Sequence, residues 1–81
     1  MSELQGWKEI EGKLCKDFEF KNFVEAFGFI SKIALESEKM DHHPEITNVY
    51  NKVRIKLITH DVNKISEKDM SLAKKIDKLN A

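Results

Sequence analysis

The sequence has little cysteine, proline or glycine, and no excess of charge of either sign. Its single cysteine, Cys15, cannot form an internal disulfide, so the fold depends on packing and not on covalent cross-links. The 14 basic and 14 acidic side chains give a formal net charge of 0. The chain therefore lacks the basic excess on which non-specific phosphate binding depends, and we do not expect a nucleic-acid-binding module.

Long hydrophobic runs are also absent. No apolar stretch approaches the roughly 20 residues that span a bilayer, and residues 1–6 have neither the basic nor the apolar region of a secretory signal. We therefore expect a cytoplasmic protein without a membrane anchor. The length of 81 residues predicts one domain, 1–81, with a thin core, because so short a chain buries only about 60% of its unfolded surface. A subunit interface would add buried area.

Two segments near the N-terminus predict β-strands. Residues 6–13 suit a short edge strand that turns at Gly12. In residues 14–20, Phe18 and Phe20 alternate with acidic side chains, which is the period of a half-buried strand.

A second pair of strands is predicted after the only proline, Pro44. Residues 45–50 are rich in β-branched and aromatic side chains, and residues 53–57 alternate apolar with basic ones. The two segments therefore predict a hairpin that turns at residues 51–52. If the second strand stays regular, His60 lies on the face away from the apolar side chains, where a ligand could reach it.

The longest predicted helix covers residues 22–40. It begins at a capping box formed by Asn22 and Glu25, and apolar residues recur behind it at three- and four-residue spacing. The apolar stripe is wider than packing on one sheet needs. We favour a helix that is packed on most of its circumference; the alternative is that part of this surface contacts a second subunit.

A second helix is predicted from Ser66 to about Asn80, because Ser66 and Asp69 form a capping signature in front of one apolar face. The order of elements is therefore strand, strand, helix, strand, strand, helix. Hairpins require antiparallel pairing, and helices that are apolar on one side must pack on the sheet. The sequence predicts an α+β fold, with a four-stranded antiparallel sheet and helices packed on one face.

All three histidines lie in junctions between predicted elements. His42 and His43 follow helix 22–40 in a segment that also contains two carboxylates and Pro44, and His60 follows the last strand. An unperturbed imidazole titrates near neutral pH, as proton transfer requires. General acid–base catalysis needs imidazoles and carboxylates beside a pocket, and the sequence supplies both.

Two other interpretations of the histidine pair remain open. His42 and His43 could cap the C-terminus of helix 22–40, where the helix dipole favours a cation. A zinc site would need three or four converging ligands, whereas adjacent histidines usually diverge and Cys15 has no partner cysteine. Metal binding is therefore not expected.

Four segments together form a specific signature. They are Glu38-Lys39-Met40-Asp41-His42-His43-Pro44-Glu45, Asn48-Val49-Tyr50-Asn51-Lys52-Val53, Thr59-His60-Asp61 and Ser66-Glu67-Lys68-Asp69. This signature strongly resembles that of the pterin-4a-carbinolamine dehydratases, over roughly residues 6–80. The resemblance implies dehydration of 4a-hydroxytetrahydropterin to quinonoid dihydropterin, the step that recycles the pterin used by aromatic amino-acid hydroxylases. The pterin is then the substrate, and neither a cofactor nor a metal is implied.

The resemblance also implies roles for individual residues. His42, His43 and His60 are the implied catalytic residues: His43 and His60 flank the leaving hydroxyl, and His42 holds or deprotonates the pterin ring. Which imidazole is the acid and which the base stays open. The residues implied to contact the substrate or support the site are Glu38, Asp41, Pro44, Thr59 and Asp61.

Three positions of the signature are expected to act indirectly. Glu38 would orient an imidazole and fix its tautomer. Asp69 is adequately explained as the capping residue of the last helix, which we prefer to a direct catalytic role. Tyr50 is explained as a residue that packs in the sheet.

The chain also departs from the pattern of the family it resembles. An aromatic residue is usual at Ile46, and small residues are usual near Asn63-Lys64, so we expect a differently shaped pocket rim. Only five residues precede Gly6, so the family's N-terminal helix is expected to be missing.

The resemblance implies a homo-oligomer, either a dimer joined through sheet edges or a tetramer formed through helix 22–40. The alternative function is a non-catalytic one, as a dimerisation cofactor for a transcription factor or for another pterin-linked partner. Vertebrate members of the family act in this way for a homeodomain protein. The neutral charge argues against direct contact with DNA.

Overall fold

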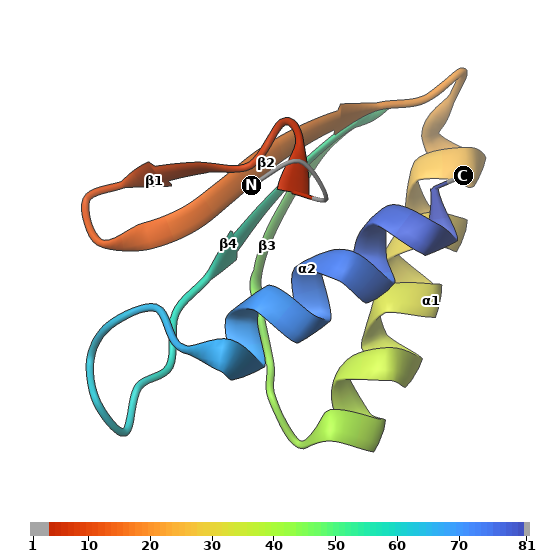
Figure 1. Cartoon of the computed structure of the whole chain (residues 1–81). Helices are drawn as coiled ribbons and strands as arrows, with labels where there is room; N and C mark the ends of the chain where they lie inside the picture. The colour runs from red at the N-terminus through yellow and green to blue at the C-terminus, as the bar shows by residue number, and fades with distance from the viewer. Residues whose placement is uncertain (1–3, 81) are drawn as a thin grey trace.

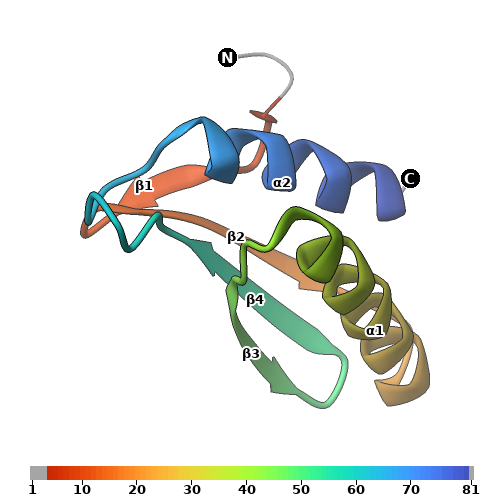
Figure 2. The same ribbon diagram turned by 90° about the horizontal axis from the view of Figure 1, so that it is seen from below.

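Residues 4–80 are described by a computed structural model (Figure 1). Its elements are β1 (Lys8–Ile10), β2 (Lys13–Glu19), α1 (Phe23–Met40), β3 (Glu45–Val49), β4 (Lys52–Leu57) and α2 (Glu67–Leu79). The strands form one antiparallel sheet in the order β1-β2-β4-β3. Both helices cover the same face of this sheet, as the view from below shows (Figure 2). The predicted α+β fold is confirmed.

Strand β4 supplies the centre of the core, because it pairs with β2 on one side and with β3 on the other. Its Val53, Ile55 and Leu57 face the helices and are buried. On β2 and just after it, Phe18 and Phe20 each lie with their ring centroids 4.9 Å from that of Phe29 on α1. The predicted shared face of Phe18 and Phe20 is therefore correct.

The opposite face of the sheet carries charged side chains that pair across the strands. Arg54 donates to Asp17 at 2.7 and 3.1 Å, and Lys13 donates to Glu45 at 2.9 and 2.8 Å. These hydrogen bonds lower the pKa of Asp17 and of Glu45 below their ordinary values. The stabilisation is present above the ordinary carboxyl pKa and is lost as the pH falls through the lowered values, and it is small because the pairs are exposed.

Helix α1 is buried along one side only, so the interpretation that it packs on most of its circumference is wrong. Ala26, Phe29 and Ile33 face the core. Four apolar side chains on the other side are exposed, a group that we call the outer patch of α1: Phe23, Val24, Phe27 and Leu35. Within residues 4–80, neither helix combines the length and hydropathy needed to cross a membrane.

The capping motif of α1 differs in one contact from the prediction. The Asn22 side chain accepts the backbone N–H of Glu25 at 2.9 Å, as expected for the first half of a capping box. The Glu25 carboxylate, however, accepts the backbone N–H of Lys21 at 3.2 Å and not that of Asn22. It still satisfies a backbone donor at the helix start.

Tyr50 does not pack in the sheet, contrary to our expectation. It forms the turn between β3 and β4 together with Asn51, has a left-handed backbone (φ 52°) and is 62% exposed. The turn therefore lies one residue earlier than predicted. Asn51 holds it to the end of β2, because its side chain donates to the Phe20 carbonyl and its own carbonyl accepts the Phe20 N–H, each at 2.8 Å.

A half-buried cluster ties α2 to the N-terminal part of the sheet. Both oxygens of Asp77 accept the indole N–H of Trp7, at 3.1 and 3.0 Å, and Oδ1 also accepts Lys16 Nζ at 2.9 Å. The side chains of Lys16 and Asp77 are only 20% and 24% exposed. Removal of this carboxylate would leave an indole and an ammonium without their main acceptor.

We expect Asp77→Ala to lower the free energy of unfolding by about 1–3 kcal/mol, the cost of partly buried donors left unpaired. Asp17→Ala is the matched control, because it removes an exposed carboxylate from an ion pair and should cost less than about 1 kcal/mol. Urea unfolding measures both values. Equal losses would show that burial of the Asp77 cluster has no energetic consequence.

Candidate active site

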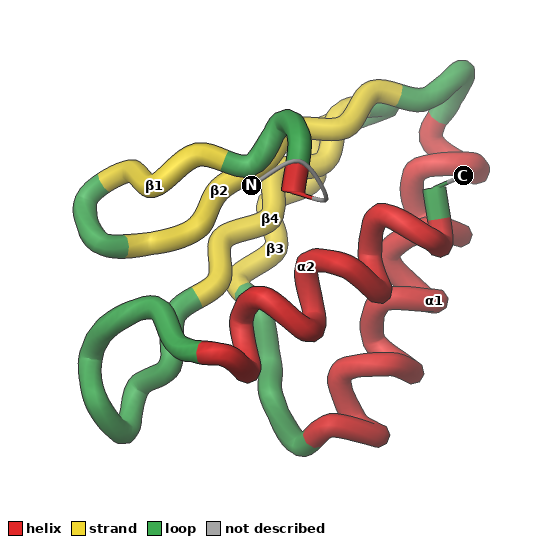
Figure 3. Tube along the Cα trace, viewed as in Figure 1, coloured by secondary structure: helices red, strands yellow, loops and turns green. Residues whose placement is uncertain are grey.

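A pocket of about 250 Å³ lies where α1 ends and α2 begins. It is lined by Asp41, His42, His43, Thr59, His60, Asp61 and Lys68. The loop after α1 and the loop between β4 and α2 supply most of these residues, and both lie at the lower end of the molecule in Figure 3. The fold therefore brings all three histidines to one pocket.

A larger groove, of about 590 Å³, lies on the charged face of the sheet. Its lining includes Asp17, Arg54 and Thr47, but none of the three histidines. Asp17 and Arg54 already neutralise one another there. Size alone would favour this groove, but the groups able to transfer protons near neutral pH converge on the smaller pocket.

The backbone at the end of α1 positions His42 and His43. Asp41 adopts a left-handed conformation (φ 52°), and its N–H donates to the Glu38 carbonyl while the His42 N–H donates to the Ser37 carbonyl. This is the pattern of a Schellman cap, which ends the helix with a sharp change of direction. Because backbone N–H groups form the cap and both imidazoles bind carboxylates, the interpretation that the imidazoles cap α1 is wrong.

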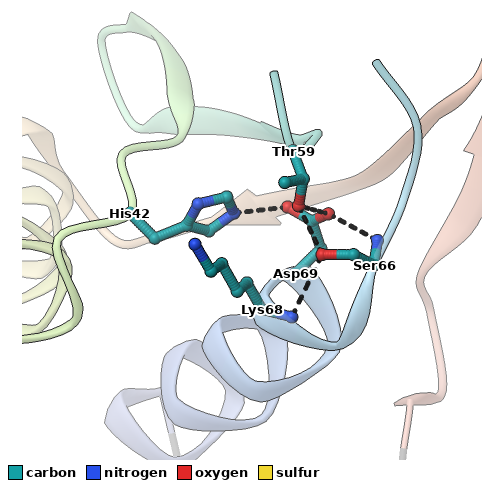
Figure 4. Close-up of polar contacts among 5 residues, drawn as sticks. All are labelled: His42, Thr59, Ser66, Lys68 and Asp69. Carbon is teal, nitrogen blue, oxygen red and sulfur yellow. Dashed lines mark hydrogen bonds and ion pairs between the residues drawn. The ribbon is translucent and has the colours of Figure 1, made fainter. Parts of the chain in front are cut away.

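His42 is buried beside a fully buried carboxylate, and its Nε2 lies 2.6 Å from Oδ1 of Asp69 (Figure 4). Oδ2 of Asp69 accepts the Thr59 hydroxyl at 2.7 Å and the Ser66 N–H at 2.9 Å. An ionised carboxylate can only accept, so Nε2 carries the hydrogen and Nδ1 remains as the other polar atom of the ring. The contact fixes both the tautomer and the orientation of His42.

Asp69 has two roles in the structure. The prediction that it closes the capping box of α2 is confirmed, since Ser66 caps the helix and donates its N–H to the Asp69 carboxylate. The contact with His42 was not predicted, because it joins residues 27 positions apart. Thr59 lines the pocket and supports this network, since its hydroxyl donates to Asp69.

His43 meets a different carboxylate in a different environment. Its Nε2 lies 2.6 Å from Oε1 of Glu38, and the two side chains are 57% and 77% exposed. The expected contact between Glu38 and an imidazole is therefore present. Because both groups are open to solvent, this pair can exchange protons with water or with a bound molecule more readily than the buried pair can.

His60 lies on the loop between β4 and α2. The strand ends at Leu57 and the two residues after it are both buried, so the alternation from which we predicted the face of His60 does not reach it. Its side chain is nevertheless exposed and lines the pocket. The loop closes where the Thr59 N–H donates to the Lys64 carbonyl, and Asn63 supplies the left-handed residue (φ 55°) that this closure needs.

The remaining predicted residues divide into two groups. Asp41 and Asp61 line the pocket, whereas Pro44 and Tyr50 do not, and Tyr50 lies at the opposite end of β3. Lys68 lines the pocket without having been predicted. The one sequence signal for Lys68 is a cation in the first turn of a helix, where the dipole disfavours it.

The charges of the pocket are mixed. Asp41 and Asp61 are acidic, Lys68 is basic, and the three histidines contribute imidazole rings. Within residues 4–80, no group of three or more His, Cys, Asp or Glu side chains is placed to hold a metal ion. The arrangement suits a small polar molecule that presents both hydrogen-bond donors and acceptors.

Comparison with known proteins finds a matching family model and similar relatives. The family model described as pterin 4 alpha carbinolamine dehydratase matches residues 1–79. A relative from Prochlorococcus marinus is 57% identical over 74 residues, which cover 91% of this chain and 77% of the relative. Another from a Jannaschia species is 50% identical over 76 residues, which cover 91% and 78%. Both are provisionally named pterin-4-alpha-carbinolamine dehydratases.

Two solved structures have the same fold. The structure titled transcriptional coactivator/pterin dehydratase, from Brucella melitensis, has a TM-score of 0.92 and 39% identity, over 95% of this chain and 84% of its own. A pterin dehydratase-like protein identified as a RuBisCO assembly factor in the alpha-carboxysome has a TM-score of 0.80 and 25% identity, over 95% and 92%. The names of these two structures thus describe different roles for proteins of the same fold.

We expect Asp69→Asn to lower the free energy of unfolding by about 1–3 kcal/mol, because an amide cannot accept from all three donors that surround this buried position. The imidazole ¹⁵N signals of His42 should also change, since the ring loses the carboxylate that fixes its tautomer. Glu38→Gln is the control, because it changes the exposed pair with His43 and should cost less than about 1 kcal/mol. If Asp69→Asn unfolded no earlier than this control, the network would not stabilise the fold.

Proposed function

The chain belongs to the pterin-4-alpha-carbinolamine dehydratase family, and we propose that it dehydrates a 4a-hydroxytetrahydropterin to quinonoid dihydropterin and water. The observation that carries this proposal is the convergence of His42, His43 and His60 on one pocket. The pterin is the substrate in this proposal, and no cofactor takes part. The reaction would return pterin to an aromatic amino-acid hydroxylase in the cytoplasm.

The chemistry of the reaction matches what these imidazoles can supply. The C4a–O bond breaks and a C4a=N5 double bond forms, so an acid must protonate the leaving hydroxyl and a base must take the N5 proton. One proton enters the substrate and one leaves it, so the total number of protons on the enzyme is unchanged. A proton transfer between the two imidazoles, directly or through water, then restores the acid and the base. Two imidazoles on one pocket can exchange these protons near neutral pH.

We assign His43 and His60 to the proton transfers, because both side chains are exposed in the pocket. Either can serve as the acid with the other as the base. His42 is buried and held by Asp69, so we assign it to binding the pterin ring. Glu38 orients His43 through the contact described above.

The acidic residues of the pocket complete the proposed site. Asp41 and Asp61 accept hydrogen bonds from the donor groups of the pterin ring, either through side chains or through backbone carbonyls. Thr59 acts through Asp69, to which it donates its hydroxyl.

A non-catalytic binding role is the alternative function. It is supported by the names of two structural relatives, one a coactivator and the other a RuBisCO assembly factor. Such a role would use the outer surfaces of the fold and would not need three imidazoles in one pocket. The intact histidine set therefore favours the enzyme.

We further propose that the protein forms a homo-oligomer. The outer patch of α1 leaves four apolar side chains exposed, and both β1 and β3 are edge strands of the sheet. Pairing of sheet edges would give a dimer, and burial of the outer patch would give a tetramer.

The dehydratase proposal predicts a large loss of rate when either exposed histidine is removed. His43→Ala and His60→Ala should each lower kcat/KM by about 10²- to 10⁴-fold, the usual contribution of general acid–base catalysis. Stopped-flow absorbance with chemically generated 4a-hydroxytetrahydropterin measures the rate. Tyr50→Asn is the control, because it changes a residue of the signature outside the pocket, and it should match the parent. No acceleration by the parent would overturn the proposal.

The oligomer proposal predicts a mass of two or four times 9.4 kDa by light scattering at micromolar concentration. Phe27→Glu should lower a tetramer to a dimer, because it places a charge in the outer patch of α1, and Lys32→Glu should not. Thr47→Glu on the charged face of the sheet gives a second control. A parent protein that stayed monomeric would contradict the proposal.

A further inference from the structure

Lys68 occupies a position that is unfavourable for the fold. It is the second residue of α2, where the helix N-terminus carries a partial positive charge. Its neighbours Glu67 and Asp69 complement this charge, whereas a lysine opposes it. Helix stability therefore does not explain why a lysine stands at this position.

The ammonium of Lys68 is also unpaired. Among residues 4–80 it makes no hydrogen bond and no ion pair, and the contact of Lys68 with Ser66 comes from its backbone N–H, at 3.3 Å. Asp41 and Asp61 line the same pocket but do not pair with it. The close-up shows the side chain extending from α2 on the side of His42 (Figure 4). The pocket therefore holds a free cation beside its imidazoles.

We propose that Lys68 donates a hydrogen bond to the carbonyl oxygen of the pyrimidine ring of the pterin, and so selects 4-oxo pterins. The inference rests on the proposed function and names the group that recognises the substrate. The ring presents N–H donors and one carbonyl oxygen. Carboxylates fit the donors, as Asp41 and Asp61 can, and an ammonium, which only donates, fits the oxygen.

The position of that oxygen in the substrate agrees with the position of Lys68. The carbonyl carbon is bonded directly to C4a, the carbon that loses the hydroxyl. A group that holds the carbonyl must therefore lie in the same pocket as the imidazoles that act at C4a, as Lys68 does. Lys68 takes no part in the proton transfers, because its charge is needed only for binding.

Selection follows from the mismatch with a 4-amino ring. A 4-amino group places N–H donors where the oxygen stood, so the ammonium would face donors and lose its acceptor. Sites built to hydrogen-bond a polar group reject analogues that lack it more strongly than apolar pockets reject a change of size. The parent protein should therefore distinguish two rings of nearly equal shape.

Fluorescence titration with 6-methylpterin and 2,4-diamino-6-methylpteridine tests the inference without turnover. The parent should bind the 4-oxo ring at least about tenfold more tightly, the effect of one charge-assisted hydrogen bond. Lys68→Met keeps the aliphatic stem and should lose most of this preference, and Lys68→Arg should keep it. Lys68→Met should melt no lower than the parent, because it removes a cation from the helix N-terminus.

Lys64→Met is the matched control, because it removes an exposed lysine of the neighbouring loop that does not line the pocket. It should bind both rings as the parent does. In the dehydration assay, Lys68→Met should raise KM at least about tenfold while kcat stays within about threefold, because binding and not proton transfer is impaired.

The outcomes separate this inference from the proposed function. An unchanged preference in Lys68→Met, or an equal loss in Lys64→Met, would overturn the role of Lys68 and leave the dehydratase intact. A parent that bound neither ring would overturn the role of Lys68, and it would overturn the dehydratase as well only if it also failed to accelerate dehydration. A parent whose preference depends on Lys68 but that does not accelerate dehydration would support the binding role and overturn the dehydratase.

Discussion

The buried carboxylate of Asp69 is the constraint on which the candidate site depends. A carboxylate removed from water is costly unless hydrogen bonds satisfy it, and Asp69 receives three, from His42, Thr59 and Ser66. These donors come from the loop after α1, the loop after β4 and the residue that caps α2. The same charge therefore holds together the three segments that form the pocket, and it orients an imidazole in doing so.

Two adjacent histidines acquire different properties from this arrangement. His42 and His43 each lie 2.6 Å from a carboxylate, but one pair is buried and the other is open to solvent. Burial holds the first imidazole in one orientation, while the second stays open to solvent. The left-handed residue Asp41, which ends α1, begins the short loop that carries both imidazoles.

The sequence was sufficient for features that depend on local pattern. The alternation in β2 and β4 and the capping residues Asn22 and Ser66 placed the elements to within a few residues. Features that depend on what covers a surface were not predictable in this way: spacing identified the apolar residues of α1 but not which side had a neighbour. The contact of Asp69 with His42 and the place of Lys68 in the pocket arise only from the tertiary fold. The family resemblance pointed to Asp69 and to His42 separately, but not to the contact between them.

The short connection between α1 and β3 also limits how this chain can change. Residues 41–44 carry the histidine pair and set the phase of the next strand. Because side chains on a strand alternate, one inserted residue would move Ile46 from the core side of β3 to its charged side. The spacing of the imidazoles is thus tied to the pairing of the sheet. A change in the length of this loop would disrupt folding as well as the histidine pair.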